Sequence, residues 1–196
     1  MIVEYKREIT YNSNNKVVEV IEKFTPVQDE KAATFNNLFA YQVKNMGNVE
    51  LPADCEIEGA TGSIIINKSV KLLKGQTITI KRKFAAGIDK SVIEGDFNPY
   101  IIVNGKRDSG RLEVHLPKHP ATSLADETQI STKDDAYYIK KDGSYPFAIE
   151  IPILGFVAAT ERFAIDSNDQ YPSFRTWVKS NGVDATDWYL RDKGAK

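Results

Sequence analysis

The residues of this chain that could perform chemistry are carboxylates and amides gathered in three short loops. The loops are Asp134-Asp135, Asp166-Ser167-Asn168-Asp169 and Asp184-Ala185-Thr186-Asp187. Calcium binds about six to eight oxygens of this kind. The candidate calcium ligands are Asp134, Asp135, Asp166 and Asp169. No spacing matches an EF-hand, and Asp and Asn also cap helices and form turns without an ion. We therefore favour capping and keep calcium as the alternative.

A pair of carboxylates could also hydrolyse a glycosidic bond if the two groups were held about 5–10 Å apart. Such a site could draw on Asp96, Asp126, Asp134, Asp135, Glu150 and Asp166. Glu150 lies opposite Phe147 and Ile149 on a two-residue period, so we interpret it first as an outward strand residue. A concave pocket holding two of these acids would indicate an enzyme, whereas acids scattered over convex loops would favour a binding module.

Histidine and nucleophile chemistry receives little support. His115 and His119 have the i, i+4 spacing of a helical zinc motif, but Pro117 lies between them and disfavours a helix. We interpret them as one surface strand histidine and one loop histidine. The sequence contains no G-x-S-x-G, P-loop or G-x-G-x-x-G pattern. Cys55, between two acidic residues, is expected to be buried or half-buried and unreactive. We therefore predict no catalytic residue.

Composition limits the remaining classes. The chain has 196 residues, with 26 Lys and Arg against 27 Asp and Glu, for a net charge of −1. This balance argues against a nucleic-acid binder, which needs a clustered basic face. We interpret Lys81-Arg82-Lys83 and Lys140-Lys141 as solvated strand faces. One cysteine permits no intramolecular disulfide. No window approaches the ~18 apolar residues that span a membrane, so no direct membrane span is expected.

The elements that would position these residues are mostly strands, because hydrophobic residues repeat every second position. A hairpin is predicted from 3–11 and 16–25, joined by Asn12-Ser13-Asn14-Asn15. Further strands are predicted at 38–43, 63–67, 76–84, 100–103, 111–116, 136–140 and 147–153. In 111–116 the apolar residues share one face, and Arg111, Glu113 and His115 share the other.

One helix is predicted near the C-terminus, at 171–181, with Tyr171, Phe174, Trp177 and Val178 on one stripe. Trp188 and Tyr189 are expected to pack as a C-terminal latch. Many short strands separated by turns indicate an antiparallel β-sandwich. The predicted fold is thus a mainly β, jelly-roll-like sandwich with one short C-terminal helix, forming a single domain over residues 1–196.

From about residue 35 to residue 189 the chain resembles the LruC-type domain. The matching runs are Phe35–Val43, Asn98–Gly105, Glu113–Pro117, Thr122–Asp126, Pro146–Pro152, Ala164–Asp166, Tyr171–Trp177 and Asp187–Tyr189. The chain departs from the family where Tyr145-Pro146-Phe147 replaces Leu-Pro-Trp, and its loop at 133–136 is short. Relatives also carry an acidic, asparagine-containing run before the strand matching Ile2–Tyr5.

What this resemblance implies is a largely β domain of exported proteins and lipoproteins of Bacteroidetes, spirochaetes and other Gram-negative bacteria. It implies a periplasmic or outer-membrane surface location and no known enzyme activity, and it supplies no catalytic residue. Because Met1 stands where the acidic run would end, we expect the chain to be trimmed at its N-terminus. A signal peptide, a lipid-anchor cysteine and part of an acidic site would then be missing.

The expected function is a cell-envelope module that binds or adheres to a glycan or protein ligand at the cell surface, without binding nucleic acid. Two alternatives stay open. One is a carboxylate- or metal-dependent glycan hydrolase, and the other is a calcium-stabilised structural domain of a larger envelope protein. No cofactor other than calcium is expected, and the ligand-binding residues are not identified.

Overall fold

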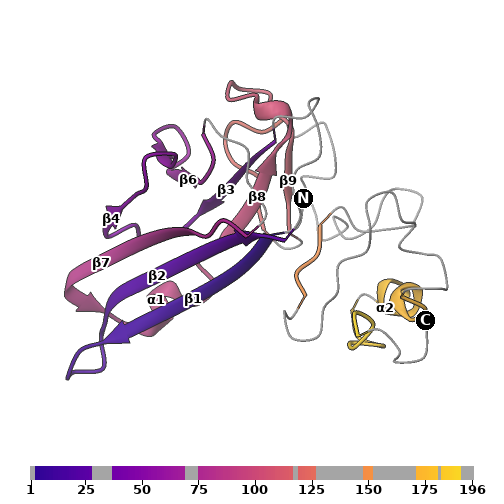
Figure 1. The fold of residues 1–196 in the computed structure, drawn as a ribbon, viewed down its shortest axis with the longest axis horizontal. Coiled ribbons are helices and arrows are strands. Elements are labelled where there is room, and N and C mark those ends of the chain that lie inside the picture. Colours follow the sequence, from indigo (N-terminus) through magenta and orange to yellow (C-terminus); the bar gives the residue numbers. More distant parts are fainter. Residues whose placement is uncertain are drawn as a thin grey trace. The chain divides into compact units, whose positions relative to one another are not determined.

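The computed structural model describes residues 3–27, 37–68, 75–116, 119–126, 148–151, 171–180 and 182–190 (Figure 1). Two compact units make up the chain. The first comprises Met1–His115 and His119–Lys133, and the second comprises Leu116–Lys118 and Asp134–Lys196. All the strands belong to the first unit, as far as the described residues show.

The first sheet, called sheet A, has the strand order β1-β2-β7-β4, and every pair in it is antiparallel. Its strands are β1 (Val3–Tyr11), β2 (Val17–Pro26), β7 (Ile78–Ile88) and β4 (Asn48–Glu50). β1 and β2 form the predicted hairpin, with Arg7 opposite Glu22. Asn15 has a φ of 58° in the hairpin turn, a left-handed conformation that asparagine tolerates better than most residues.

The second sheet, called sheet B, has the order β5-β6-β3-β8-β9 and is also antiparallel. Its strands are β5 (Glu56–Glu58), β6 (Ser63–Ile65), β3 (Leu38–Gln42), β8 (Asn98–Ile102) and β9 (Glu113–His115). A short helix α1 (Lys90–Ile93) follows β7, and a 3-10 turn η1 (Val103–Gly105) follows β8.

The main core lies between the two sheets. Phe24 and Ile80 of sheet A pack with Tyr41 and Ile64 of sheet B, and all four are fully buried. The opposite face of sheet B is buried as well, because Ala40, Ile65, Tyr100 and Ile102 form a second apolar cluster. Both faces of sheet B therefore carry buried side chains, although Ile57 on its outer strand β5 is exposed.

The second unit contains the C-terminal helix α2 (Phe174–Lys179). Phe174 and Val178 on this helix pack with Tyr171 and Trp188 in a small apolar cluster. The predicted stripe and the predicted packing of Trp188 are confirmed, and the helix is shorter than the predicted 171–181. No helix within the described ranges is both long and apolar enough to cross a membrane.

The predicted class, an antiparallel β-sandwich with little helix, is confirmed by the two packed sheets. The strand predicted at 147–153 is wrong at 148–151, where the backbone has no strand pairing. The strand predicted at 136–140 lies outside the described residues. The alternation at 148–151 instead reflects the packing of Ile149 and Ile151, which are half-buried against the α2 cluster while Glu150 is exposed.

Candidate functional site

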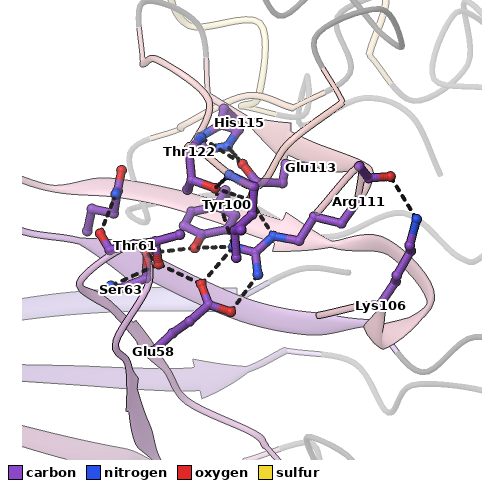
Figure 2. Close-up of polar contacts among 12 residues, drawn as sticks. Glu58, Thr61, Ser63, Tyr100, Lys106, Arg111, Glu113, His115 and Thr122 are labelled. Carbon is purple, nitrogen blue, oxygen red and sulfur yellow. Dashed lines mark hydrogen bonds and ion pairs between the residues drawn. The ribbon is translucent and has the colours of Figure 1, made fainter. Parts of the chain in front are cut away.

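The most concentrated set of polar side chains lies on the face of sheet B that points away from sheet A (Figure 2). We call it the Arg111 cluster; it consists of Glu58, Thr61, Ser63, Tyr100, Arg111, Glu113, His115 and Thr122. Ser63 precedes Ile65 by two residues, and Tyr100 belongs to the second apolar cluster. The polar residues thus share a strand face with buried aliphatic side chains.

Strand register brings these residues together from distant parts of the sequence. Tyr100 on β8 lies directly opposite His115 on β9, and their rings stack with centroids 4.5 Å apart. Glu58 on β5 lies opposite Ser63 on β6. Residues directly opposite on antiparallel strands have Cβ atoms about 5 Å apart, so the side chains of each pair are in contact. Four of the five strands of sheet B, namely β5, β6, β8 and β9, contribute residues to the cluster.

Arg111 is the centre of the cluster and is fully buried. Its Nη1 and Nη2 donate to the two oxygens of Glu58 at 2.5 and 2.9 Å, and its Nε donates to Glu113 Oε1 at 2.6 Å. Nη2 also lies 3.2 Å from the Tyr100 hydroxyl oxygen. Burial alone would lower the pKa of Arg111, but the bonds to both carboxylates outweigh it and raise the pKa, so the guanidinium stays charged.

Glu113 is the second central residue of the cluster, and its two carboxylate oxygens take part in four hydrogen bonds. Oε1 accepts from Arg111 Nε and from the Thr122 hydroxyl at 2.7 Å. Oε2 faces His115 Nε2 at 2.8 Å and accepts from the Thr122 backbone amide at 2.9 Å. Burial alone would raise the pKa of Glu113, but the hydrogen bonds from His115, Thr122 and Arg111 outweigh it and lower the pKa to about 2. The carboxylate is therefore ionised at neutral pH.

His115 presents both ring nitrogens to oxygen atoms. Nδ1 lies 2.9 Å from Asn98 Oδ1, and Nε2 faces Glu113. The Asn98 amide nitrogen donates to Gln42 Oε1 and to the Pro120 carbonyl, which fixes the Asn98 oxygen toward the ring. The His115 ring is therefore held on both sides, by Asn98 at Nδ1 and by Glu113 at Nε2.

The cluster also fastens residues 119–126 to the edge of sheet B. Arg111 forms a parallel bridge with Ala125, and the Leu124 carbonyl accepts from the amides of Gly110 and Arg111. Thr122 adds its two bonds to Glu113. The titratable side chains of this cluster thus form their hydrogen bonds with one another and with the backbone. Their arrangement holds residues 119–126 against sheet B.

A second polar group, which we call the Arg82 cluster, lies among the apolar residues between the sheets; it comprises Arg7, Glu22, Tyr41, Arg82 and Asp96. Arg82 Nε and Nη2 donate to the two oxygens of Glu22 at 3.2 and 3.0 Å, and Arg82 Nη1 donates to the Asn45 carbonyl at 2.6 Å. Arg7 Nη2 and the Tyr41 hydroxyl also donate to Glu22, at 2.9 and 2.8 Å.

Asp96 completes the charge balance of the Arg82 cluster. Its Oδ2 lies 3.4 Å from Arg82 Nη1, and its Oδ1 forms an ion pair with Arg7 Nη2 at 3.2 Å without a hydrogen bond. Burial raises the pKa of Asp96, and the two arginines counter this only in part. The cluster joins β1, β2, β3 and β7 to the segment before β8 through two cations and two anions.

The acids considered for catalysis or metal binding do not meet in the described part of the chain. Asp96 has a fully buried side chain in the Arg82 cluster. Asp126 is half-buried, and its backbone amide donates to the Arg111 carbonyl at 2.8 Å. Glu150 is exposed, as predicted, and belongs to the second unit. The calcium candidates Asp134, Asp135, Asp166 and Asp169 lie outside the described residues.

Within the described residues, no three His, Cys, Asp or Glu side chains are placed to share a metal ion. Cys55 is buried, as predicted. Its pKa is raised to about 11, mainly because it is buried and to a smaller extent because of the negative charge of Asp54. The thiol is consequently protonated at neutral pH, in agreement with the structural role expected for it.

Two interpretations of charged residues are wrong. His115 is not a surface residue, because it is 8% exposed and bonded on both sides. Arg82 does not belong to a solvated strand face, because it is fully buried. A sequence signal for Arg82 existed, since Ile80, Arg82 and Phe84 alternate on one side of β7. The sequence held no comparable signal for Arg111, whose partner Glu58 lies 53 residues earlier.

Comparison with known proteins gives one family and no close relative. No curated protein and no solved structure shows significant similarity to the chain. A family model described as a domain of unknown function (DUF4842) matches residues 8–189. The match begins within β1, covers both polar clusters apart from Arg7, and extends to Tyr189 after α2. By this match the chain belongs to the DUF4842 family of domains of unknown function.

Proposed function

We propose that the chain is a non-catalytic binding module of the bacterial cell envelope, exported to the periplasm or the outer-membrane surface, that binds a glycan or protein ligand. The observation that supports it best is the Arg111 cluster. Arg111, Glu113 and His115 are the residue types of an acid–base site, yet each is at most 8% exposed. Their donors and acceptors face one another. They therefore support the fold and leave recognition to the outer surface.

Residues of a general acid–base site must reach the proton that they transfer, at about 3 Å or through one water molecule. The Glu113 carboxylate already accepts four hydrogen bonds, and losing them would leave a buried anion unpaired. A substrate could not take the place of these donors without breaking the sheet contacts that they maintain. The arrangement thus favours a scaffold over the competing glycan hydrolase.

The envelope location is the finer part of the proposal and rests on the resemblance to LruC-type domains. An antiparallel sandwich with both polar clusters buried leaves its loops and strand edges as the surfaces for a ligand. The fold alone does not specify a function, since β-sandwiches carry many. The ligand class is accordingly given as a glycan or a protein.

The test applies the labelled, folded chain to arrays of bacterial and host-surface glycans and to immobilised envelope proteins, with heat-unfolded chain as the control. We expect saturable binding by the folded chain to at least one glycan or protein class. The same glycans are incubated with the chain, and reducing ends are measured to detect hydrolysis. Hydrolysis together with no saturable binding would replace the proposal with the hydrolase alternative.

A further inference from the structure

The long N-terminal strand β1 is the outermost strand of sheet A (Figure 1). β2 pairs with one side of β1 along its length, and within the described ranges no strand pairs with the other side. β2 has five buried residues, whereas none of the nine residues of β1 is buried. Tyr11 on β1 is 39% exposed, which makes it one of the exposed large hydrophobic residues. Among the described residues this edge is thus long and unpaired, with one register irregularity between Thr10 and Tyr11.

We propose that this edge pairs with β1 of a second copy of the chain, antiparallel and with Arg7 opposite Arg7 on the two-fold axis. Centring on Arg7 pairs every residue from Val3 to Tyr11 with one from the other strand, since Arg7 is the middle of the nine residues. The two sheets A then join into one continuous sheet. Such a contact uses the same patch on both copies, as a two-fold dimer requires.

The charges on the outward face of β1 fit this register. With Arg7 at the centre, Lys6 of each copy lies opposite Glu8 of the other, which gives two complementary pairs. Glu4 lies opposite Thr10 and meets no like charge. Lys6 and Glu8 are well exposed, at 65% and 40% of their side chains, and within one copy Glu8 pairs with Lys6 at 3.3 Å and with Lys23 at 2.7 Å. Exposed ion pairs contribute little free energy, so these side chains can exchange their partners for those of a second strand. Opposite charges directly across a strand pair stabilise it, and like charges destabilise it.

The inward face of β1 fits the same register. Tyr5 lies opposite Ile9 of the other copy, and the exposed Tyr11 lies opposite Val3. Aromatic and β-branched residues are favourable partners across strands. The two Arg7 side chains meet at the axis, but each is drawn inward by Glu22 at 2.9 Å and by the Ile93 carbonyl at 3.2 Å. Their charges are therefore neutralised within each copy.

Inward charges and lysines on an edge strand can also prevent two edges from pairing. Whether the charges of β1 favour or oppose pairing depends on which residues lie opposite each other, that is, on the register. A shift that centres the pair on Tyr5 would also match charges, placing Glu4 opposite Lys6. It would pair only 3–7 of β1 with itself and would leave Tyr11 uncovered. The register centred on Lys6 would place Glu4 opposite Glu8 and Lys6 opposite Lys6. The full-length, charge-matched register is the one that we adopt.

The first test is a register-specific cross-link. A Lys6→Cys chain and a Glu8→Cys chain are mixed and oxidised with oxidised glutathione, which takes up the two thiol hydrogens as the disulfide forms. Directly opposite residues have Cα atoms about 4.5–5.5 Å apart, which suits a disulfide. We expect a cross-linked heterodimer. Each variant alone should remain uncross-linked, because like positions are offset by two residues and lie roughly 8 Å apart.

The matched control mixes the Lys6→Cys chain with a Glu4→Cys chain, which would cross-link in the register centred on Tyr5. Equal yields from the two mixtures, or a higher yield from the control, contradict the proposed register. Absence of any cross-link in the first mixture contradicts the contact itself. Cys55 is present in every variant and is buried, so it contributes equally to all of them.

The second test measures self-association of the unaltered chain by sedimentation equilibrium over a wide range of concentration. We expect a monomer–dimer equilibrium. Lys6→Glu should weaken it about tenfold or more, because two attractive pairs become repulsive. Adding Glu8→Lys to Lys6→Glu should restore it, although the exposed Lys23–Glu8 pair within each copy is lost. A chain that stays monomeric throughout, as expected if another segment of the same chain covers β1, overturns the proposal.

Discussion

Glu113 shows how one carboxylate can determine the local structure. It contacts a guanidinium, a ring nitrogen, a hydroxyl and a backbone amide, which belong to the three residues Arg111, His115 and Thr122. A buried anion of this kind contributes little net stability relative to an apolar residue, but removing one of its partners is costly. The residue therefore specifies how β9 and the segment 119–126 fit together more than it adds free energy.

Replacing Glu113 by Gln tests this role. The amide keeps the shape of the side chain, loses the charge, and turns one acceptor into a donor that faces other donors. We expect the free energy of unfolding, measured by urea denaturation, to fall by roughly 3 kcal/mol. Glu50→Gln is the control, since Glu50 pairs with Lys83 on the surface and the change should have little effect. Equal effects of the two substitutions would contradict the role assigned to Glu113.

Acid should weaken the same contact. The pKa of Glu113 falls from its ordinary 4.5 to about 2 on folding, so the ionised carboxylate stabilises the folded state. This contribution is complete above pH 4.5 and is lost as the pH falls toward 2. Asp96 acts with the opposite sign, because burial raises its pKa. Urea midpoints measured across this range should fall less steeply for Glu113→Gln than for the unaltered chain. Parallel curves would show that Glu113 is not the group responsible.

At the scale of the elements, strand positions could be predicted but the polar face of sheet B could not. Alternation correctly places Glu113 and His115 of β9 on the same side as Arg111, which precedes the strand, but it does not say which side is buried. Their burial depends on Glu58 and Thr122, which are remote in sequence. The usual assumption that charged faces point to water failed because the charges neutralise one another inside the fold.

A glycine fixes how β4 meets β7. Gly47, just before β4, has a φ of +61°, and a Cβ there would lie 2.6 Å from the Phe84 ring and 2.7 Å from the Lys83 carbonyl oxygen. Gly62 has a similar φ of +68° and open space around it. We expect Gly62→Ala to cost about 1 kcal/mol from backbone strain and Gly47→Ala about 2 kcal/mol more from overpacking, both measured by thermal denaturation. Similar losses would show that the space beside Phe84 is not needed.

For the molecule as a whole, the sandwich class followed from short alternating strands, but the order of the strands did not. Nothing in the alternation indicates that β7 pairs with β2 rather than with β6, its predecessor in sequence. The charged residues of the Arg82 cluster would have helped, because Arg7, Glu22 and Arg82 each interrupt an apolar strand face. Opposite charges at such positions suggest which strands are neighbours.

Calcium binding would act on the stability of the molecule as a whole. The candidate ligands are Asp134, Asp135, Asp166 and Asp169, and a bound ion would raise stability by RT ln(1 + [L]/Kd). If calcium binds, the melting temperature measured with excess calcium should exceed that measured with a chelator. Asp166→Asn should then reduce the difference, and magnesium should not reproduce it. Identical melting curves with calcium and chelator would remove calcium from the alternatives.

The spacing of the Arg82 and Arg111 contacts along the chain has a consequence for synthesis on the ribosome. Arg7 is translated early, but its partner Asp96 is translated 89 residues later. In the same way, Glu58 is translated well before its partner Arg111. The charge cluster of the nascent N-terminal hairpin, in which Arg7 already faces Glu22, therefore stays incomplete until Arg82 and Asp96 have been made. Completion of the sandwich is postponed until Thr122 has left the exit tunnel, and a chain stalled before that point would remain a ready target for chaperones and proteases.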